Sequence, residues 1–253
     1  LIAAASGALL SKIILHESNL LFFKLKQPFD YNNVPFYILL GLLAGITSLY
    51  YVNFFDKVES KFHTIKSGFT KWFIGGVALV FLFALFPSLF GEGYESIKAL
   101  SEFRTDALFR DSLLLGFIKS KWTLLFFITI TLLLKAFAAA ITLGSGGNGG
   151  NFAPSLFVGA YLGFAFSFFL TLMGFNDIPV SNFTIVAMAG ILSGVFHAPL
   201  TAIFLIAEIT GGYELIIPLM IVASISYIIV KRFHPESLDV RRLRNKGTIV
   251  SEN

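Results

Sequence analysis

The sequence predicts an all-α integral membrane protein, a multi-helix bundle with broken and re-entrant helices. Of the 253 residues, 56% are hydrophobic and 13% charged, and the mean hydropathy is +0.79, whereas soluble domains contain about a quarter charged residues. Apolar segments follow one another with short polar breaks between them, and two adjacent segments are short and separated by a proline. Such a chain would expose large apolar patches in water, so lipid is its expected solvent.

The apolar segments are the expected helices, and a helix that spans a bilayer needs about 20 apolar residues. They cover residues 1–15, 35–54, 72–90, 113–143, 152–173, 182–195, 198–210 and 214–232. The segments 182–195 and 198–210 are too short to span, and Pro199 disfavours helix at the residue before it. Interrupted helices of this kind end inside the membrane, where irregular backbone persists when it is buried in protein or lines a cavity. Transporters build substrate sites at such ends.

The positive charges predict the orientation, because cytoplasmic loops are rich in Lys and Arg. The break at 55–71 and the C-terminal stretch are both basic, so both are expected in the cytoplasm. Their basic residues are Lys57, Lys61, Lys66, Lys71, Lys231, Arg232, Arg241, Arg242, Arg244 and Lys246. The breaks at 16–34 and 91–111 fit the outer side. Because Leu1 begins inside an apolar stretch without a leader, we expect a fragment of a longer protein.

A glycine-rich stretch at residues 144–154 carries the strongest chemical signal. It reads Gly-Ser-Gly-Gly-Asn-Gly-Gly-Asn-Phe-Ala-Pro and leads into an apolar helix. Gly149 and Gly150 permit backbone conformations closed to other residues, and Pro154 suits the first turn of a helix. Free N–H groups and the positive end of the helix dipole then form an anion site without a charged side chain. A site of this kind suits a permeating ion, which must also be released.

Residues Gly150, Asn151, Phe152, Ala153 and Pro154 fit the G-x-F-x-P motif of the CLC family of chloride channels and chloride/proton antiporters. The glycines before the motif, the Gly-Glu-Gly-Tyr-Glu-Ser-Ile run at 91–97, the stretch 196–208 and the Leu-Ile-Ile-Pro run at 215–218 follow in the family's order. The chain therefore resembles the C-terminal half of that fold. The resemblance implies that 1–15 is the last helix of the first repeat, 35–246 the second inverted repeat and 247–253 the start of a cytoplasmic linker.

The resemblance also implies a function. We expect transport of chloride or a similar small anion across a membrane, through a voltage-gated channel or by chloride/proton antiport. The backbone amides of Asn151 and Phe152 would bind the anion. The expected partners are the lipid bilayer and a second copy of the chain, which would meet it through 1–15, 198–210 and 214–232. No catalytic residue, metal, cofactor or nucleic acid is expected, and the location is a bacterial inner or plasma membrane.

The sequence departs from the family pattern in two places. The signatures G-S-G-I-P and G-[KR]-E-G-P, which carry an anion-binding serine and a gating glutamate, are absent from these residues. In addition, Asp239 aligns with a tyrosine whose hydroxyl lines the pore in many members. Either the site lacks that hydroxyl ligand, or Asp239 points to the cytoplasm. We favour the second, because Arg241 and Arg242 follow closely.

Other polar residues in apolar segments are expected to have structural roles. Lys135 is expected to form a buried ion pair, with Glu208 as a candidate partner; the alternative is a field that attracts anions toward the pore. His197 is expected to be a satisfied polar group at the helix break. Two alternative functions are a different secondary transporter with broken helices and an intramembrane serine protease that uses Ser145 and His197. The protease is disfavoured because Leu143 stands where its G-x-S-G pattern needs glycine.

Overall fold

The computed structural model describes residues 2–10, 13–14, 28–108, 112–113, 116, 120–175, 177–211 and 213–245, and its regular elements are helices. This confirms the all-α prediction. The longer helices are α1 (Ile2–Leu10), α2 (Val34–Thr64), α3 (Gly68–Leu85), α4 (Tyr94–Ser101), α5 (Lys121–Gly144), α6 (Phe152–Leu172), α7 (Val180–Phe196), α8 (Pro199–Thr210), α9 (Ile216–Phe233) and α10 (Leu238–Asn245). Short 3-10 turns are η2 (Tyr31–Asn33), η3 (Pro87–Leu89), η4 (Thr105–Leu108) and η6 (Tyr213–Leu215).

Five stretches of the described chain are long and apolar enough to cross a membrane: Tyr31–Thr64, Gly68–Leu85, Lys121–Gly144, Phe152–Leu172 and Tyr213–Arg244. Helices α7 and α8 are shorter, as the sequence predicts. The expected helix over 72–90 breaks earlier, because Pro87 cannot continue α3 and begins η3 instead. Helix α2 runs past the expected end at 54 to Thr64. The linker 247–253 lies outside the described residues.

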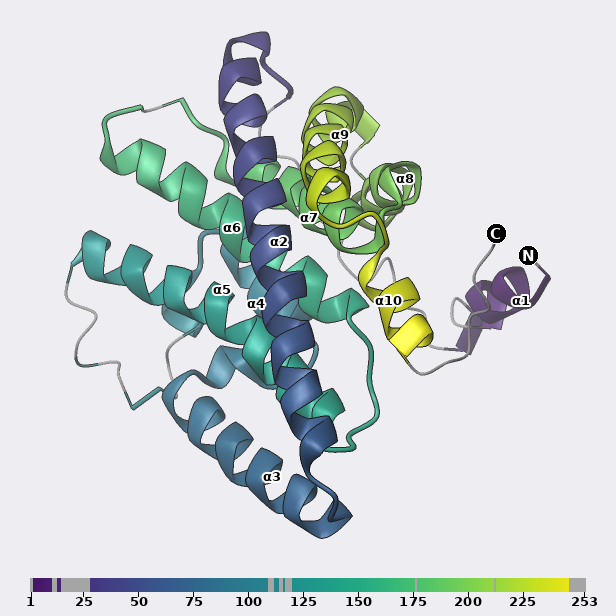
Figure 1. The fold of residues 1–253 in the computed structure, drawn as a ribbon. Helices are drawn as coiled ribbons and strands as arrows, with labels where there is room; N and C mark the ends of the chain where they lie inside the picture. Colours follow the sequence, from purple (N-terminus) through teal and green to yellow (C-terminus); the bar gives the residue numbers. More distant parts are fainter. Residues whose placement is uncertain are drawn as a thin grey trace.

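Helix α7 is the centre of the bundle. Every residue from Ser181 to Val195 is buried, and α6, α2 and α9 pack around it. Helix α8 continues from α7 after the break at His197. Gly75 alone is buried in α3, which suits a lipid-facing helix, and α1 lies apart from the other helices (Figure 1).

Paired glycines let these helices approach closely. Gly159 and Gly163 on α6 face α7, and a Cβ at Gly159 would lie 2.5 Å from the Cα of Met188. Gly190 on α7 faces both α2 and α9, where a Cβ would lie 2.9 Å from that of Ala44. In membranes, small residues four apart allow such backbone contact and the dispersion energy that comes with it. The spacing of α2, α6 and α9 around α7 therefore depends on these positions.

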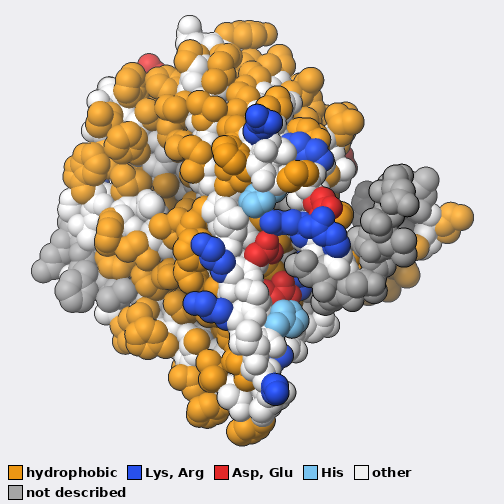
Figure 2. All heavy atoms as spheres, in the orientation of Figure 1, with side chains coloured by type: hydrophobic (Ala, Val, Ile, Leu, Met, Phe, Trp, Pro, Cys, Tyr) orange, Lys and Arg blue, Asp and Glu red, His pale blue; other side chains and the backbone are white. Residues whose placement is uncertain are grey.

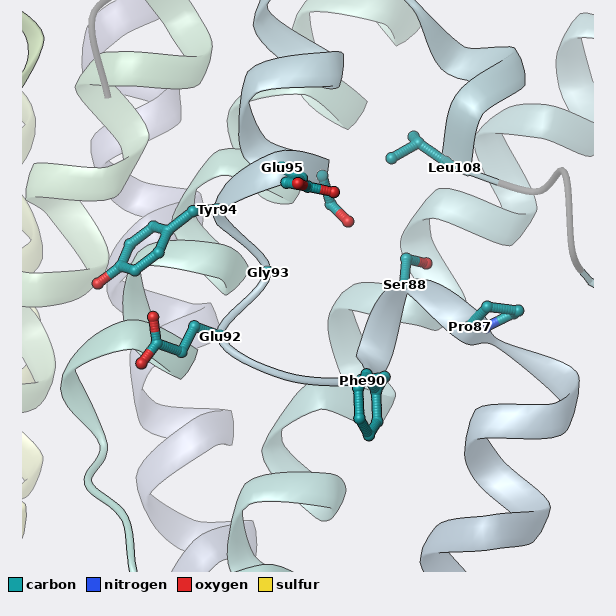
Figure 3. Close-up of a pocket in the computed structure, with 9 residues that line it drawn as sticks. Pro87, Ser88, Phe90, Glu92, Gly93, Tyr94, Glu95 and Leu108 are labelled. Atoms are coloured by element: carbon teal, nitrogen blue, oxygen red, sulfur yellow. The ribbon is translucent and has the colours of Figure 1, made fainter. Parts of the chain in front are cut away.

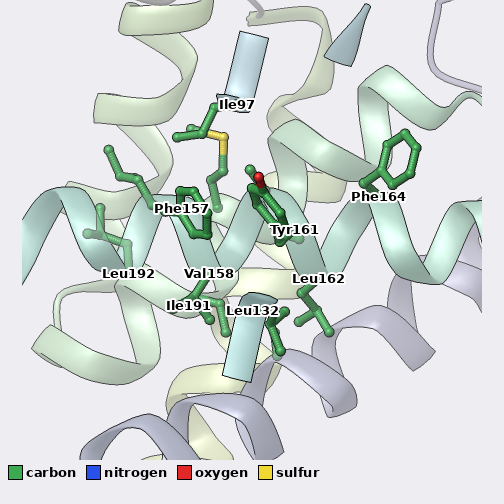
Figure 4. Close-up of a cluster of buried hydrophobic side chains, with 14 of the residues drawn as sticks. Ile97, Leu132, Phe157, Val158, Tyr161, Leu162, Phe164, Ile191 and Leu192 are labelled. Atoms are coloured by element: carbon green, nitrogen blue, oxygen red, sulfur yellow. The ribbon is translucent and has the colours of Figure 1, made fainter. Parts of the chain in front are cut away.

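Aromatic and aliphatic side chains fill the space between α4, α5, α6 and α7. Phe157 and Tyr161 stack on α6 with ring centroids 4.0 Å apart, and Ile97, Leu132 and Ile191 surround them (Figure 4). All five side chains are buried. This cluster holds the first turns of α6 in place and so positions the glycine-rich loop that precedes them.

Candidate anion-binding site

The glycine-rich loop joins the end of α5 to the start of α6. Helix α5 closes at Ser145, and Gly146 follows with a φ of 98°, a conformation that favours glycine. The N–H of Gly147 then bonds the carbonyl of Thr142 at 2.9 Å, which completes the helix end. The chain reverses here and reaches α6 at Phe152, as the sequence predicts.

The start of α6 leaves backbone donors open. The N–H of Ser155 bonds the carbonyl of Asn151 at 3.0 Å, which is the first helical bond. Phe152 and Ala153 precede it, so their N–H groups have no carbonyl one turn earlier within the helix. Pro154 has no N–H. Asn151 occupies the capping position, but its side chain makes no capping bond. The N–H groups of Phe152 and Ala153 are therefore left without an intrahelical partner at the positive end of a 21-residue helix.

A buried tyrosine from another helix contacts this site. The hydroxyl of Tyr51, on α2, donates to Oδ1 of Asn151 at 3.2 Å, and both residues are buried. Tyr51 was not among the residues predicted for the site. Its one signal was a polar hydroxyl near the middle of a long membrane helix, where polar groups are expensive and often functional.

A cavity of about 590 Å³ lies beside the start of α6. The loop and the first turn of α6 contribute Gly149, Gly150, Phe152, Ala153 and Pro154 to its lining, which also includes Lys135, Glu92 and Tyr94. This space is far larger than a halide ion. The turn is therefore not packed dry against hydrocarbon, which would have excluded an ion site there.

Lys135 is buried beside this cavity, with 2% of its surface exposed. Its Nζ donates to the carbonyls of Leu89 at 3.0 Å and Gly91 at 2.9 Å, and lies 4.5 Å from the centroid of the Phe157 ring. The expected ion pair with Glu208 is wrong, because the lysine reaches the carbonyls that end η3 instead. Its positive charge lies near the first turns of α6, where it adds to the helix dipole.

A second cavity, of about 460 Å³, lies around the segment 87–95. Figure 3 shows Glu92 and Tyr94 projecting to the same side of this segment. Glu95 also lines the cavity, so two carboxylates border it. Two carboxylates with no basic side chain among the described lining residues repel anions, whereas the first cavity is lined by Lys135 as well as by its one carboxylate, Glu92.

Charged side chains gather on one face, over the end of α2 and over α10 (Figure 2). Arg242 donates from Nε and Nη2 to Oε1 of Glu59, at 3.1 and 2.7 Å, and its guanidinium lies 5.2 Å from the centroid of Phe55. Arg241 forms an ion pair with Asp56 at 2.9 Å. These contacts fasten α10 to α2 one to two turns beyond Tyr51.

A sequence model of the family described as voltage gated chloride channel matches residues 1–231. The chain belongs to this family. It is 30% identical over 214 residues to a ClcB-like protein of Ralstonia nicotianae, covering 83% of this chain and 46% of that protein. It is 27% identical over 242 residues to the voltage-gated ClC-type chloride channel ClcB of Escherichia coli, covering 94% and 53%. The chain thus spans about half the length of the curated relatives it matches.

Solved CLC structures share the fold. A slow cyanobacterial Cl⁻/H⁺ antiporter matches with a TM-score of 0.74 at 22% identity, covering 95% of this chain and 54% of that one. A CLC-type fluoride/proton antiporter matches with a TM-score of 0.66 at 21% identity, covering 90% and 51%. Together with the apolar spans, the family match identifies this CLC chain as a multi-pass integral membrane protein.

The remaining sequence predictions have different outcomes in this CLC chain. Asp239 lies half-buried in the first turn of α10, and its role at the pore stays a prediction. The two residues of the protease alternative have other partners. Ser145 Oγ donates to the carbonyl of Thr142 at 3.1 Å, and the His197 ring packs edge-on against Tyr227 with centroids 5.9 Å apart. The family match does not favour that alternative.

Proposed function

We propose that this chain takes part in the passage of chloride or a similar small anion across a membrane, with the anion held by the backbone N–H groups of Asn151 and Phe152. The observation that carries the proposal is the start of α6, which is uncapped by its own side chain and borders a cavity of about 590 Å³. The names of the relatives, which refer to chloride channels and to Cl⁻/H⁺ and fluoride/proton antiporters, support an anion as the substrate.

The physical reason is the balance between attraction and release. Backbone N–H groups and a helix dipole attract an anion with partial charges, whereas a full charge in direct contact would hold it too tightly to conduct. Lys135 lies near the first turns of α6, but its Nζ is already occupied by two carbonyls and an aromatic face. It therefore contributes a favourable field without becoming a direct ligand.

Bromide diffraction tests the location of the anion. Crystals of the full-length protein soaked in bromide should give an anomalous peak within hydrogen-bond distance of the N–H groups of Asn151 and Phe152. A peak that occurs solely elsewhere in the protein contradicts the proposed site.

Flux through liposomes tests the activity and its type. Vesicles that contain the full-length protein should release chloride faster than empty vesicles and should not release sodium. Proton uptake driven by a chloride gradient identifies exchange, and chloride movement without proton movement identifies a channel. Chloride release no faster than from empty vesicles contradicts anion transport.

We also propose that the C-terminus lies in the cytoplasm of a bacterium. The ion pairs between α2 and α10 support this, because they join the two basic segments on one face. A membrane-impermeant thiol reagent applied to intact cells should leave a cysteine at Arg244 unlabelled and should label it after lysis. Labelling of intact cells would contradict this orientation.

The proposed homodimer uses α1, α8 and α9. Large apolar side chains on the latter two helices are exposed, notably Leu200, Phe204 and Met220 at 69, 56 and 53%. Because the chain contains no cysteine, a single cysteine at Phe204 gives a clean cross-linking test. A dimer band with a short bifunctional thiol reagent is expected, and a matched cysteine at exposed Val80 on α3 should give none. Equal cross-linking at both positions would contradict this interface.

A further inference from the structure

Asparagine is among the residues that most readily cap a helix, yet Asn151 does not cap α6. A capping side chain accepts a hydrogen bond from the second or third residue of the helix. In α6 the third residue is Pro154, which has no N–H, so Ala153 supplies the one N–H within reach. Asn151 makes no such bond. Its Oδ1 accepts a hydrogen bond from the Tyr51 hydroxyl at 3.2 Å instead.

The other end of the same amide is unsatisfied. Nδ2 of Asn151 is buried and has no hydrogen-bond partner within the described part of the chain, and the whole residue is 4% exposed. Buried donors without acceptors are rare in native proteins and call for an explanation. This donor lies on the residue that opens α6, next to backbone N–H groups that are themselves open. An acceptor bound at Nδ2 would satisfy it.

Tyr51 is well placed to fix the amide. It is fully buried, and its ring stacks on that of Phe55 one turn away at an interplanar angle of 17°. Phe55 in turn lies under the guanidinium of Arg242. The hydroxyl is therefore presented from a packed aromatic pair and holds the Asn151 oxygen away from the N–H of Ala153.

We infer that Tyr51 holds Asn151 in an uncapped orientation, so that Nδ2 joins the N–H groups at the start of α6 as a ligand for the anion. The inference rests on the proposed function, because it takes the position of the anion from it. The ligand class is a small monoatomic or planar anion that accepts several N–H donors. The side-chain amide adds a neutral donor, which strengthens binding without a fixed charge. Asn151 is thus a binding residue, and Tyr51 a positioning residue that acts through it.

Chloride titration calorimetry on the full-length protein separates these roles. Asn151→Leu keeps the size and removes the donor, so chloride affinity should fall about tenfold, as for a lost hydrogen bond to a charged group. Tyr51→Phe removes no ligand. It frees Oδ1 to cap Ala153, so affinity should fall by about threefold to tenfold. In the Asn151→Leu background, Tyr51→Phe should have no further effect.

Tyr37→Phe is the matched control. Tyr37 lies on the same helix, is equally buried and stacks on Phe183 at 4.4 Å, but lies at the other end of α2. Removing the Tyr37 hydroxyl should leave chloride affinity unchanged. Thermal unfolding of each variant shows whether it is folded. If Asn151→Leu does not fold, Asn151→Ala replaces it. Tyr51→Phe tests the positioning role of Tyr51 independently of either variant.

The outcomes distinguish the two proposals. Absence of chloride binding to the wild-type protein overturns the proposed function. If the wild-type protein binds chloride and Asn151→Leu binds it with the same affinity, Nδ2 is not a ligand, and the proposed function still stands. If Tyr51→Phe lowers chloride affinity by the same factor in the wild type and in the Asn151→Leu background, Tyr51 does not act through Asn151. Bromide density within hydrogen-bond distance of Nδ2 in the wild type, with Oδ1 turned to the N–H of Ala153 in Tyr51→Phe, supports both roles.

Discussion

Replacing Lys135 by methionine tests what the buried ammonium does. Methionine has a similar length and fills the same apolar space. The change removes the hydrogen bonds to the carbonyls of Leu89 and Gly91 and the contact with the Phe157 ring. It also removes the cost of burying a charge, so the two effects oppose each other.

The sizes of these opposing energies decide whether Lys135→Met raises or lowers the free energy of unfolding. A hydrogen bond to a charged group contributes about 1.5–3 kcal/mol, and an unpaired buried carbonyl costs about 1–3 kcal/mol. Desolvation of an ammonium costs several kcal/mol, which offsets most of the gain from the two bonds and the ring contact. Gly91 is exposed, so its carbonyl can bind water after the change, whereas Leu89 is 1% exposed and its carbonyl is left unpaired. We therefore expect Lys135→Met to lower the free energy of unfolding by about 1–3 kcal/mol.

Equilibrium unfolding in mixed micelles, followed by the fluorescence of Trp72 and Trp122, measures this difference. Lys98→Met is the control, because Lys98 is exposed on the nearby α4 and surface changes stay within about 0.5 kcal/mol. A free energy of unfolding for Lys135→Met equal to or higher than that of the wild type would show that the charge is not a net stabiliser. Lys135 would then be retained for its field alone.

Two further predictions concern packing and ion pairs. Gly159→Ala should lower the free energy of unfolding by about 1–3 kcal/mol, because its Cβ would meet backbone atoms of α7 that cannot move aside. The control is Gly76→Ala on α3, whose Cβ would meet nothing within 4 Å. This control should be neutral or stabilising by up to about 1 kcal/mol. Equal unfolding midpoints for the two variants would contradict this. Glu59→Gln should cost about 1–3 kcal/mol and expose α10 to protease, since it leaves the half-buried Arg242 without an anionic partner. Arg244→Gln, which removes an exposed pair, should cost less than about 1 kcal/mol, and protease sensitivity equal to that of Glu59→Gln would refute the distinction.

The membrane helices were predictable because their signal is local. A long apolar run must be helical in lipid, since backbone groups have no other partner there, and α6, α7, α8 and α9 begin and end within two residues of the expected bounds. The amphipathic helices α4 and α10 were not predicted as elements from periodicity. Each has eight residues and a polar composition, so neither produces an apolar run.

The glycine-rich loop was also predictable, because its residues specify both a turn and a helix start at adjacent positions. The side-chain environment of the loop was not. Lys135 bonds carbonyls 44 and 46 residues away, and carbonyls leave no mark in a sequence. A search for a charged partner therefore selected Glu208, which instead accepts a hydrogen bond from Tyr213 at 2.8 Å.

The Tyr51 and Asn151 contact shows why such sites are hidden from local patterns. The two residues are 100 positions apart, and α2 packs more extensively on α7 than on α6. Ala44 and Tyr51 lie two turns apart on one face of α2, and Ala44 meets α7 at Gly190, while Gly159 of α6 meets α7 at Met188. The distance between the Tyr51 hydroxyl and the Asn151 amide therefore depends on how closely α2 and α6 each pack against α7 at these two glycines. Side chains added at those contacts would move α2 or α6 away from α7 and separate Tyr51 from Asn151, so the proposed anion site requires the same tight glycine packing as the fold.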